Sequence, residues 1–437
     1  MKGAGSGSGK ITNPNVAEPS PGSLFDHVLY HFDRAADRIG IDPYTRKIMR
    51  TTTNEILVHF PVKMDDGRIE IMAGYRFQYN NVQGPFQGGM RYHPRLDQDL
   101  ARGLAALATW RAALVGLPAG GAEGGLQIDP ARYTLGELER ITRRFTYALG
   151  NVIGPEYDIP APDVNTNSQI MVWMLDTYLS TLQPLERARN THVVTGKPLE
   201  SGGTQGRDKA TGQGLVYLLN EWSRDRHFAL YSATYSLQGF GNVGSWTARL
   251  LKAEGCRLMA VEDHTGAIRN KDGIDPDELF AYVSSTGGVK GYPKGEAIDH
   301  EAFLKTKADI FIPAALENQI HGENADLLNV RVVAEGANGP LAPLADANFE
   351  KRGIDVLPDI LSNSGGVIVS YYEWLQNKRS EYWELEEVDT KLHKRIVDAY
   401  VKVRDTARNL SVDWRTAAYI VALQRMATVY KERGIFP

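Results

Sequence analysis

Residues 234–254 read TYSLQGFGNVGSWTARLLKAE and place a Gly-rich turn between an expected strand and an expected helix. Glycines spaced as Gly-x-Gly-x-x-Gly in that context are typical of a dinucleotide-binding βαβ unit. Gly239 permits the tight turn, Gly241 lets the backbone approach a pyrophosphate, and Gly244 allows the helix to pack closely on the strand. The helix N-terminus adds partial positive charge. We therefore expect a Rossmann-type domain around this stretch.

The next expected strand, over 257–262, supplies the second part of the nucleotide motif. It ends in Glu262 and Asp263, where a carboxylate can accept hydrogen bonds from the ribose 2′-hydroxyl. Two acids without an adjacent arginine favour NAD over NADP, although Arg257 leaves NADP open. Asn242 and Val243 complete the expected cofactor-binding turn. The alternative is a Gly-rich loop that serves only packing.

Alternation of strands and helices continues on both sides of this motif. Strands are expected at 234–238, 257–262, 309–312, 331–334 and 355–357, and helices at 214–224, 245–254, 366–377, 384–408 and 414–433. Such alternation indicates βαβ units on a parallel sheet.

The chain before the Gly-rich stretch at 201–206 predicts a separate α/β domain. Its expected helices lie at 24–40, 101–115 and 134–151, and its expected strands at 56–61 and 70–79. We expect a tail over 1–22, a first α/β domain over 23–205, a dinucleotide-binding domain over 206–360, and C-terminal helices over 361–437.

Bulk composition excludes several classes of protein. The 437 residues carry a formal net charge of −4 with both signs mixed, which argues against nucleic acid or an anionic membrane as the main partner. The single cysteine, Cys256, fits a reducing cytoplasm and is expected to pack as a small apolar residue. No apolar run reaches the roughly 20 residues of a membrane helix, and the N-terminus lacks a signal-peptide core.

Several long motifs carry a resemblance to a known family. They are GPFQGGMRYHP at 84–94, IGPEYDIPAPDVNT at 153–166, KATGQG at 209–214, GFGNVG at 239–244, AEGANGP at 334–340 and SNSGGVIVSYYEW at 362–374. With them the chain resembles the glutamate/leucine/phenylalanine/valine dehydrogenases, and glutamate dehydrogenase above all. The resemblance runs from about residue 24 to the C-terminus. It implies a hexamer, interfaces formed by the amino-terminal domains, and C-terminal helices that return to the first domain.

At three positions the resemblance implies lysines that this chain lacks. Gln87 stands where a lysine pairs with the distal carboxylate of glutamate, and Arg111 where a lysine holds the α-carboxylate. Glu123 stands at the catalytic lysine, whose ammonium polarises the substrate carbonyl or imine. A carboxylate there reverses the field that stabilises developing negative charge.

Other site residues implied by the resemblance are retained. Asp163 matches the proton-transferring aspartate, and Ser370 matches a serine that helps to bind the distal carboxylate. The remaining implied contacts are Gly88 and Gly89 with substrate, Thr211 with the nicotinamide carboxamide, and Asn338 and Asn363 with the nicotinamide and substrate.

The replacements favour a catalytically impaired subunit, although alternatives remain open. Gln87 alone is compatible with a monocarboxylate substrate, but leucine- and valine-specific relatives keep the catalytic lysine. Glu123 and Asp163 also suit an acid/base pair, or on charge grounds a metal site. His93 and His264 are expected to be hydrogen-bonded structural residues.

Our hypothesis is a regulatory subunit of a hetero-oligomeric, NAD-dependent glutamate dehydrogenase, paired with a catalytic paralogue and responsive to an amino acid such as leucine. The competing hypotheses are a directly active NAD-dependent amino acid dehydrogenase with a rearranged pocket, and a plain nucleotide-binding scaffold.

Overall fold

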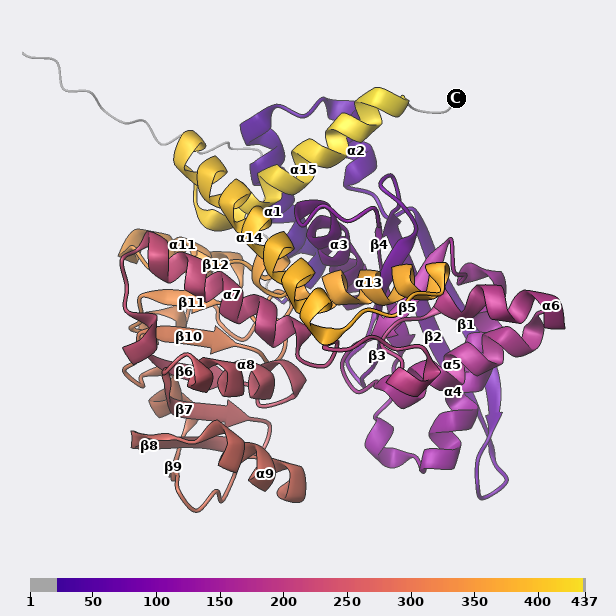
Figure 1. Cartoon of the computed structure of the whole chain (residues 1–437), viewed down its shortest axis with the longest axis horizontal. Helices are drawn as coiled ribbons and strands as arrows, with labels where there is room; N and C mark the ends of the chain where they lie inside the picture. The colour runs from indigo at the N-terminus through magenta and orange to yellow at the C-terminus, as the bar shows by residue number, and fades with distance from the viewer. Residues whose placement is uncertain (1–21, 435–437) are drawn as a thin grey trace, which may run out of the picture.

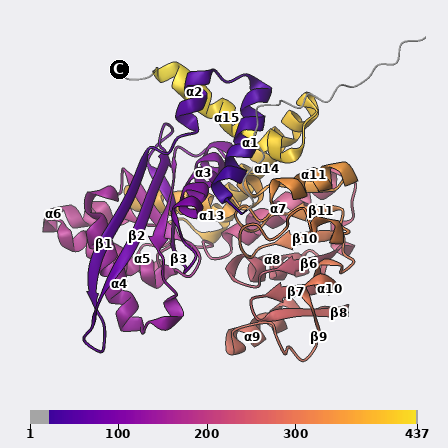
Figure 2. The same ribbon diagram turned by 180° about the vertical axis from the view of Figure 1, so that it is seen from behind.

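The computed structural model describes residues 22–434, which form two α/β lobes side by side with C-terminal helices lying across both (Figure 1). One lobe contains a five-stranded sheet and the other a seven-stranded sheet. Figure 2 shows the same two lobes from behind, with β1 and β2 on the outer side of the first lobe. The expected tail at 1–22 lies almost wholly outside the described residues.

The first sheet has the strand order β1-β2-β4-β3-β5. Its strands are β1 (Asn54–Lys63), β2 (Ile69–Asn80), β3 (Phe86–Tyr92), β4 (Gly121–Leu126) and β5 (Asp158–Pro162). β2 runs antiparallel to β1 and β4, whereas β3 runs parallel to β4 and β5. The prediction of β1 and β2 is confirmed. The pattern gave no signal for β3, β4 and β5, because glycine and proline are depleted in ordinary strands.

Helices cover this sheet and carry clear end signals. They are α1 (Leu24–Ile39), α2 (Pro43–Met49), α3 (Gln98–Leu114), α4 (Leu135–Leu149), α5 (Ser168–Thr181) and α6 (Pro184–Arg187). α4 begins with a capping box between Thr134 and Glu137. α3 starts at the N-cap Asp97, whose side chain accepts from the Leu100 amide, and it is buried along most of its length. α3 therefore acts as the core helix of the first lobe.

The second sheet has the order β12-β11-β10-β6-β7-β8-β9. Its strands are β6 (Thr234–Gln238), β7 (Arg257–Asp263), β8 (Gly266–Ile274), β9 (Glu296–Ile298), β10 (Ile310–Pro313), β11 (Val332–Ala334) and β12 (Asp355–Leu357). β12 to β7 pair in parallel, which confirms the Rossmann-type sheet. β8 and β9 are antiparallel. The prediction of a parallel sheet is therefore wrong at this edge. β8 follows β7 through a short hairpin, which needs no crossover helix.

The helices of the second lobe connect these strands. They are α7 (Ala210–Asp225), α8 (Asn242–Ala253), α9 (Pro276–Thr286), α10 (His300–Leu304), α11 (Pro343–Arg352) and α12 (Asp359–Ser362). α8 begins inside the glycine motif, with Gly241 as its N-cap, three residues earlier than the helix expected from Ser245. Cys256 is buried beside β7, and its thiol donates to the Leu230 carbonyl at 3.1 Å.

The last three helices return to the first lobe, as the resemblance implied. They are α13 (Gly365–Arg379), α14 (Leu385–Leu410) and α15 (Trp414–Arg433). α15 packs against α1 and α3, while α14 packs against α7 and α15. One hydrophobic core consequently runs from α1 and α3 into the second sheet. Among the described residues, no helix combines the length and apolar character needed to cross a membrane.

Candidate functional site

A cavity of about 1760 Å³ lies between the two lobes, with walls from both sheets and from α13. All of the predicted site residues line it: Gln87, Gly88, Gly89, Arg111, Glu123, Asp163, Thr211, Gly239, Gly241, Asn242, Val243, Glu262, Asp263, Asn338 and Ser370. The structure therefore brings together residues that are up to 283 positions apart, from Gln87 to Ser370. Asn363 lines the same cavity.

The substrate end of the cavity is built on β3 and β4, two strands that only glycine allows to approach so closely. A Cβ on Gly88 would stand 1.5 Å from the carbonyl oxygen of Ala122. A Cβ on Gly89 would stand 2.7 Å from both the Cβ of Asp163 and Oε1 of Glu123. The glycines therefore hold the carboxylates of Glu123 and Asp163 as neighbours on the cavity wall.

Glu123 is buried, and only one of its two carboxylate oxygens has a hydrogen-bond partner in the described structure. The Gly89 amide donates to Oε2 at 3.0 Å, while Oε1 is buried and has no hydrogen-bond partner in the described structure. Burial and the neighbouring Asp163 raise the pKa of Glu123 to about 8, although Arg91 and Arg76 partly oppose the shift. A proton is therefore held here near neutral pH, where the resemblance implied an ammonium.

Arg91 is the main positive charge beside these acids, and the sequence pattern did not single it out. Its Nε donates to Asp163 at 2.5 Å, and its Nη1 donates to Glu317 at 2.5 Å. Arg91 lies on β3 and Glu317 follows β10, so this ion pair crosses from one lobe to the other. Burial opposes the charge of Arg91, but the two carboxylates outweigh it and raise its pKa. In the sequence, the one feature that could have identified Arg91 as a site residue is its position within the motif GGMRYHP.

Arg111 makes a second contact across the cavity. Its Nη2 donates to Oδ1 of Asn338 at 2.6 Å, and Asn363 donates to the same oxygen at 2.9 Å. Nε of Arg111 is buried without a partner among the described residues. Burial lowers the pKa of Arg111, while nearby Asp359, Asp163 and Glu123 act in the opposite direction. Arg111 thus reaches from α3 to the loop after β11.

Gln87 and Ser370 lie at the remaining part of the substrate end. Nε2 of Gln87 is buried and has no partner in the part of the chain that is described. Ser370 accepts a hydrogen bond from Nε of Arg207 at 2.8 Å. Arg207 is a cavity residue that was not predicted, although it directly follows the Gly-rich stretch at 201–206. Burial lowers its pKa.

The three positions that lack the implied lysines share one property. Gln87, Arg111 and Glu123 each hold a buried polar atom that has no hydrogen-bond partner within residues 22–434. Buried polar groups in folded proteins are usually paired, because leaving one unpaired costs about 1–3 kcal/mol. Their clustering at one end of one cavity indicates groups arranged for a bound molecule.

The nucleotide end follows the glycine motif closely. Gly239 has a φ of 93°, and a Cβ there would stand 2.5 Å from the Ala314 carbonyl oxygen. A Cβ on Gly244 would meet the carbonyl oxygen of Gly239 at 2.0 Å. Around Gly241, by contrast, no heavy atom lies within 4 Å of the corresponding point. That open space at the start of α8 fits the pyrophosphate of a dinucleotide.

The two acids at the end of β7 have different surroundings. Glu262 accepts from Nε2 of Gln238 at 3.0 Å and lies 2.8 Å from Nδ1 of His300. Asp263 accepts from the Thr265 and Val289 amides and so holds the following loop. The residues present therefore fit a nicotinamide dinucleotide, with carboxylates where the ribose is expected. Thr211 lies on α7, and its hydroxyl is 2.7 Å from the point where a Cβ on Gly366 would stand.

The two histidines considered in the sequence also line the cavity. Nδ1 of His93 accepts a hydrogen bond from the Arg95 amide at 3.1 Å, which is a structural role. No group of three or more His, Cys, Asp or Glu side chains within residues 22–434 is arranged to hold a metal ion. A metal site at Glu123 and Asp163 therefore gains no support.

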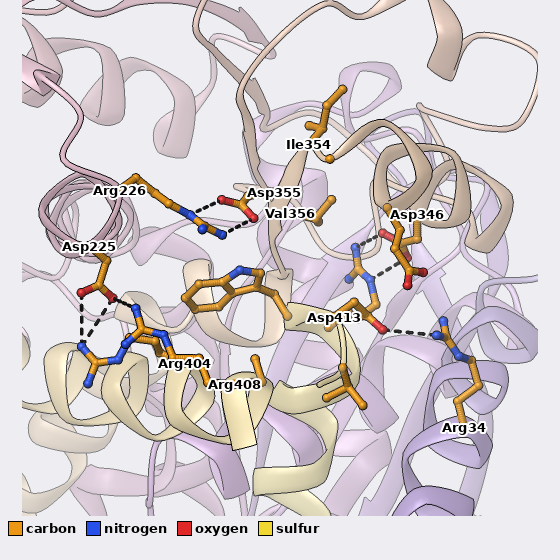
Figure 3. Close-up of a pocket in the computed structure, with 16 residues that line it drawn as sticks. Arg34, Asp225, Arg226, Asp346, Ile354, Asp355, Val356, Arg404, Arg408 and Asp413 are labelled. Carbon is orange, nitrogen blue, oxygen red and sulfur yellow. Dashed lines mark hydrogen bonds and ion pairs between the residues drawn. The ribbon is translucent and has the colours of Figure 1, made fainter. Parts of the chain in front are cut away.

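A second cavity, of about 420 Å³, lies where α1, α7, α11, α14 and α15 meet (Figure 3). Its charged side chains bind one another: Arg226 pairs with Asp355 at 2.7 Å, and Arg34 pairs with Asp413 at 3.2 Å. Arg404 lies 3.4 Å from Asp225. Figure 3 shows these pairs around the cavity wall.

Comparison with known proteins agrees with this architecture. Residues 52–180 match the model of the Glu/Leu/Phe/Val dehydrogenase dimerisation domain, and residues 202–434 match that of Glutamate/Leucine/Phenylalanine/Valine dehydrogenase. The chain belongs to this family, whose members are oxidoreductases acting on CH–NH2 donors with a nicotinamide dinucleotide.

Within the family, the relatives are glutamate dehydrogenases. The enzyme of Thermotoga maritima is 43% identical over 416 residues, covering 95% of this chain and 99% of the relative. The structure of a hetero-hexameric glutamate dehydrogenase from Thermus thermophilus, in a leucine-bound form, has a TM-score of 0.91 at 34% identity and covers 96% and 99% of the two chains. That from Peptoniphilus asaccharolyticus has a TM-score of 0.78 at 34% identity and covers 94% and 100%. This chain is thus a glutamate dehydrogenase-family subunit.

Proposed function

We propose that this chain is a catalytically impaired, regulatory subunit of a hetero-oligomeric, NAD-dependent glutamate dehydrogenase. The assembly would convert glutamate, NAD and water to 2-oxoglutarate, ammonia and NADH, with turnover in a catalytic paralogue. The observation that carries the proposal is Glu123, a buried carboxylate beside Asp163 at the position of the catalytic lysine.

The physical argument is electrostatic. A lysine ammonium stabilises negative charge that develops on the substrate oxygen, whereas Glu123 is either neutral or negative. Over the three replaced positions the family's three positive charges become at most one, from neutral Gln87, positive Arg111 and a Glu123 that is neutral when protonated and negative when ionised. Each misplaced group is worth on the order of 2–4 kcal/mol. Two or three together would remove about 10⁴-fold or more of the rate.

An oligomer is supported by the first lobe. β1 is an edge strand, and its hairpin with β2 exposes the large apolar side chains of Leu57, Ile69 and Ile71. Exposed apolar groups gathered on an edge hairpin favour burial against another subunit. The similar Thermus thermophilus protein is hetero-hexameric and was solved in a leucine-bound form. We propose a hexamer for this chain too, with a catalytic paralogue as partner and an amino acid such as leucine as effector.

NAD is the proposed cofactor, because Glu262 and Asp263 end β7 and would repel the 2′-phosphate of NADP. The single, buried cysteine supports a cytoplasmic location. In this role the glycine motif would maintain nucleotide binding and the closed arrangement of the lobes rather than turnover.

Steady-state glutamate oxidation by the purified chain, with NAD and with NADP, tests the proposal. We expect turnover far below about 1 s⁻¹ for the chain alone. The triple variant Gln87→Lys/Arg111→Lys/Glu123→Lys should gain activity, whereas Glu123→Lys alone should gain less. A matched control is Arg269→Lys on the exposed part of β8, which should leave the low rate unchanged.

The competing function is a directly active NAD-dependent amino acid dehydrogenase in which Glu123 and Asp163 form an acid/base pair. The raised pKa of Glu123 favours it, since a proton donor with a pKa of about 8 suits general acid chemistry. Turnover above about 1 s⁻¹ by the unmodified chain would establish this alternative and reject the regulatory role.

A further inference from the structure

We propose that three buried residues, Arg415, Glu335 and Asp359, act as positioning residues for the central cavity. They hold the loop after β11 in the place where its Asn338 meets Arg111 at the substrate end. They act through the loop, because in the described structure they lie outside the lining of the cavity. The inference goes beyond the proposed function, since it holds for a silent chain and for an active one.

Arg415 lies at the start of α15, and only 5% of its side chain is exposed. Its Nη1 and Nη2 donate to the two carboxylate oxygens of Glu335 at 2.9 and 2.7 Å. Its Nε and Nη2 donate to Asp346 on α11 at 2.7 and 3.0 Å. Its Nη1 also donates to Asp359 on α12, at 3.4 Å. Within residues 22–434, these five contacts match the five N–H donors of a guanidinium. Arg415 therefore ties three segments of the second lobe to α15.

Glu335 and Asp359 connect Arg415 to the backbone of the loop. The Asp359 amide donates to Oε2 of Glu335 at 2.6 Å, and the Gly339 amide donates to Oδ2 of Asp359 at 2.8 Å. Glu335 directly follows β11 and Gly339 directly follows Asn338, so the loop is held at both ends. Gly339 has a φ of 52°, and a Cβ there would stand 2.6 Å from Cδ1 of Leu24. The loop therefore also packs tightly against α1.

The middle of the same loop is held from α3. Nη2 of Arg111 donates to Oδ1 of Asn338 at 2.6 Å, and Nδ2 of Asn363 donates to the same oxygen at 2.9 Å. α3 packs against α15, the helix that carries Arg415. The loop is thus held by two arginines that lie on a pair of packed helices. A change at Arg415 should therefore reach the cavity through the position of Asn338.

The cluster places three carboxylates around one guanidinium, which links its hold on the loop to pH. Burial raises the pKa of Glu335 to about 8, and Asp359 adds to the shift while Arg415 opposes it. The ionisable groups around the cluster are Arg415, Tyr419 and the N-cap Asp413 of α15, Asp346 on α11, Asp359 on α12, and His31 and Arg34 on α1.

The raised pKa of Glu335 fixes the direction of this pH dependence. A carboxyl whose folded pKa lies above its ordinary value of 4.5 stabilises the fold at low pH. That contribution is lost as pH rises to about 8, because the folded cluster then gives up its extra proton. The hold on the loop should therefore weaken over this range.

Hydrogen–deuterium exchange of the purified full chain, measured by mass spectrometry without any ligand, tests the inference. The reporter is the segment 335–341, which contains the Gly339 amide bound to Asp359. Arg415→Lys keeps the positive charge but removes the planar fork of donors. We expect exchange in this segment to become about tenfold faster or more. The α15 segment 417–426 should exchange as before, because its buried apolar side chains still hold it. A merely structural role for Arg415 would accelerate exchange in both segments.

Two further variants separate the parts of the mechanism. In the unmodified chain, protection of the segment 335–341, corrected for the intrinsic exchange rate, should fall about threefold or more from pH 6 to pH 9. Glu335→Gln keeps the size of the side chain and cannot ionise, so it should remove most of this pH dependence. Arg415→Lys combined with Arg111→Leu should accelerate exchange by less than the product of the two single effects, because both arginines hold one loop.

The matched control is Arg404→Lys on α14, whose partner is Asp225 on α7. It makes the same change of side chain in another partly buried ion pair, and it should alter neither the exchange of the segment 335–341 nor its pH dependence. A thermal unfolding curve for each variant verifies that it is folded. If Arg415→Lys does not fold, the pH dependence in Glu335→Gln decides the question.

Several results would overturn the inference. They are unchanged exchange of the segment 335–341 in a folded Arg415→Lys variant, equal acceleration of this segment and of α15, or independent effects of Arg415→Lys and Arg111→Leu. A pH dependence that is absent from the unmodified chain, or that persists in Glu335→Gln, would also overturn it. These results are separate from the turnover assay, so the proposed function stands or falls independently of this inference.

Discussion

The two ends of the central cavity differ in how well their polar groups are satisfied. At the nucleotide end, Glu262 and Asp263 are hydrogen-bonded by neighbouring side chains and amides, and Gly239 and Gly244 occupy positions where a Cβ would clash with backbone. At the substrate end, Gln87, Arg111 and Glu123 each hold a buried atom without a partner among the described residues. The nucleotide end therefore has the geometry expected of the glycine motif, and the unpartnered polar atoms of the substrate end lie at the three positions where the resemblance implies lysines.

This difference indicates that the packing of the two lobes and the substrate end of the cavity depend on separate interactions. The Arg91 and Arg111 contacts still join the lobes, and the C-terminal helices still share a core with α1 and α3. The contacts that join the lobes do not involve Gln87 or Glu123, two of the three positions where the resemblance implies lysines. Four measurements test this difference between the two ends of the cavity, in order of decreasing expected effect.

The largest expected effect concerns the ion pairs of Arg91. Arg91→Leu would leave Asp163 and Glu317 as neighbouring carboxylates without their shared cation. We expect the free energy of unfolding to fall by about 3–5 kcal/mol in urea denaturation. The control Arg269→Leu removes an exposed pair with Glu296 on the second lobe and should cost less than about 1 kcal/mol. Equal losses would show that the cross-lobe pairs add no particular stability.

The next effect is the pH dependence that Glu123 imposes. Its pKa in the folded chain, about 8, exceeds its ordinary value of 4.5, so the folded state binds more protons between these values. Stability contributed in this way falls as pH rises from about 4.5 to 8. Glu123→Gln should therefore be more stable than the unmodified chain by about 1–3 kcal/mol at alkaline pH, and the difference should shrink towards pH 5.

Urea denaturation of both proteins across this pH range provides the measurement. Glu335 also has its pKa raised to about 8 by burial, but it is present in both proteins and cancels in the comparison. A stability difference that does not vary with pH would contradict the assigned protonation of Glu123.

A smaller effect separates binding from folding at the nucleotide end. Gly241→Ala adds a methyl group where no heavy atom lies within 4 Å, at a residue with φ of −80°. Stability should change by less than about 1 kcal/mol, while NAD affinity should fall by about tenfold because the methyl occupies the pyrophosphate approach. Fluorescence titration with NADH measures this. If Gly241→Ala lowered stability but left NAD affinity unchanged, Gly241 would serve folding and not the approach of the cofactor.

The smallest expected effect concerns cofactor choice. Glu262→Gln removes one negative charge at the end of β7 and keeps the hydrogen-bonding shape. The preference for NAD over NADP should narrow by about three- to tenfold, measured from the two dissociation constants. Asp263→Asn serves as the comparison, because Asp263 already holds the 265–289 loop through two amides. An unchanged ratio in Glu262→Gln would exclude a direct role in ribose recognition.

The amino-acid sequence was sufficient to predict the family, the dinucleotide-binding motif and most of the helices. Short-range patterns carry this information: the glycine spacing at 239–244 requires a strand–turn–helix, and apolar residues at helical period predict α3 and α15. The three positions at which the resemblance implies lysines were also predicted without coordinates, from the motifs around Gln87, Arg111 and Glu123.

The contacts at the substrate end of the cavity could be read only from the tertiary structure. β3 and β4 carry glycines that allow the strands to approach closely, and β5 carries two prolines. Glycine and proline are both depleted in strands, so local propensity counts against all three strands. Arg91, Arg207 and Glu317 joined the site through contacts between segments far apart in the chain. The protonation of Glu123 depends on burial and on Asp163, and both arise from packing. The charge of a buried group is set by its surroundings, and those surroundings exist only once the chain has folded.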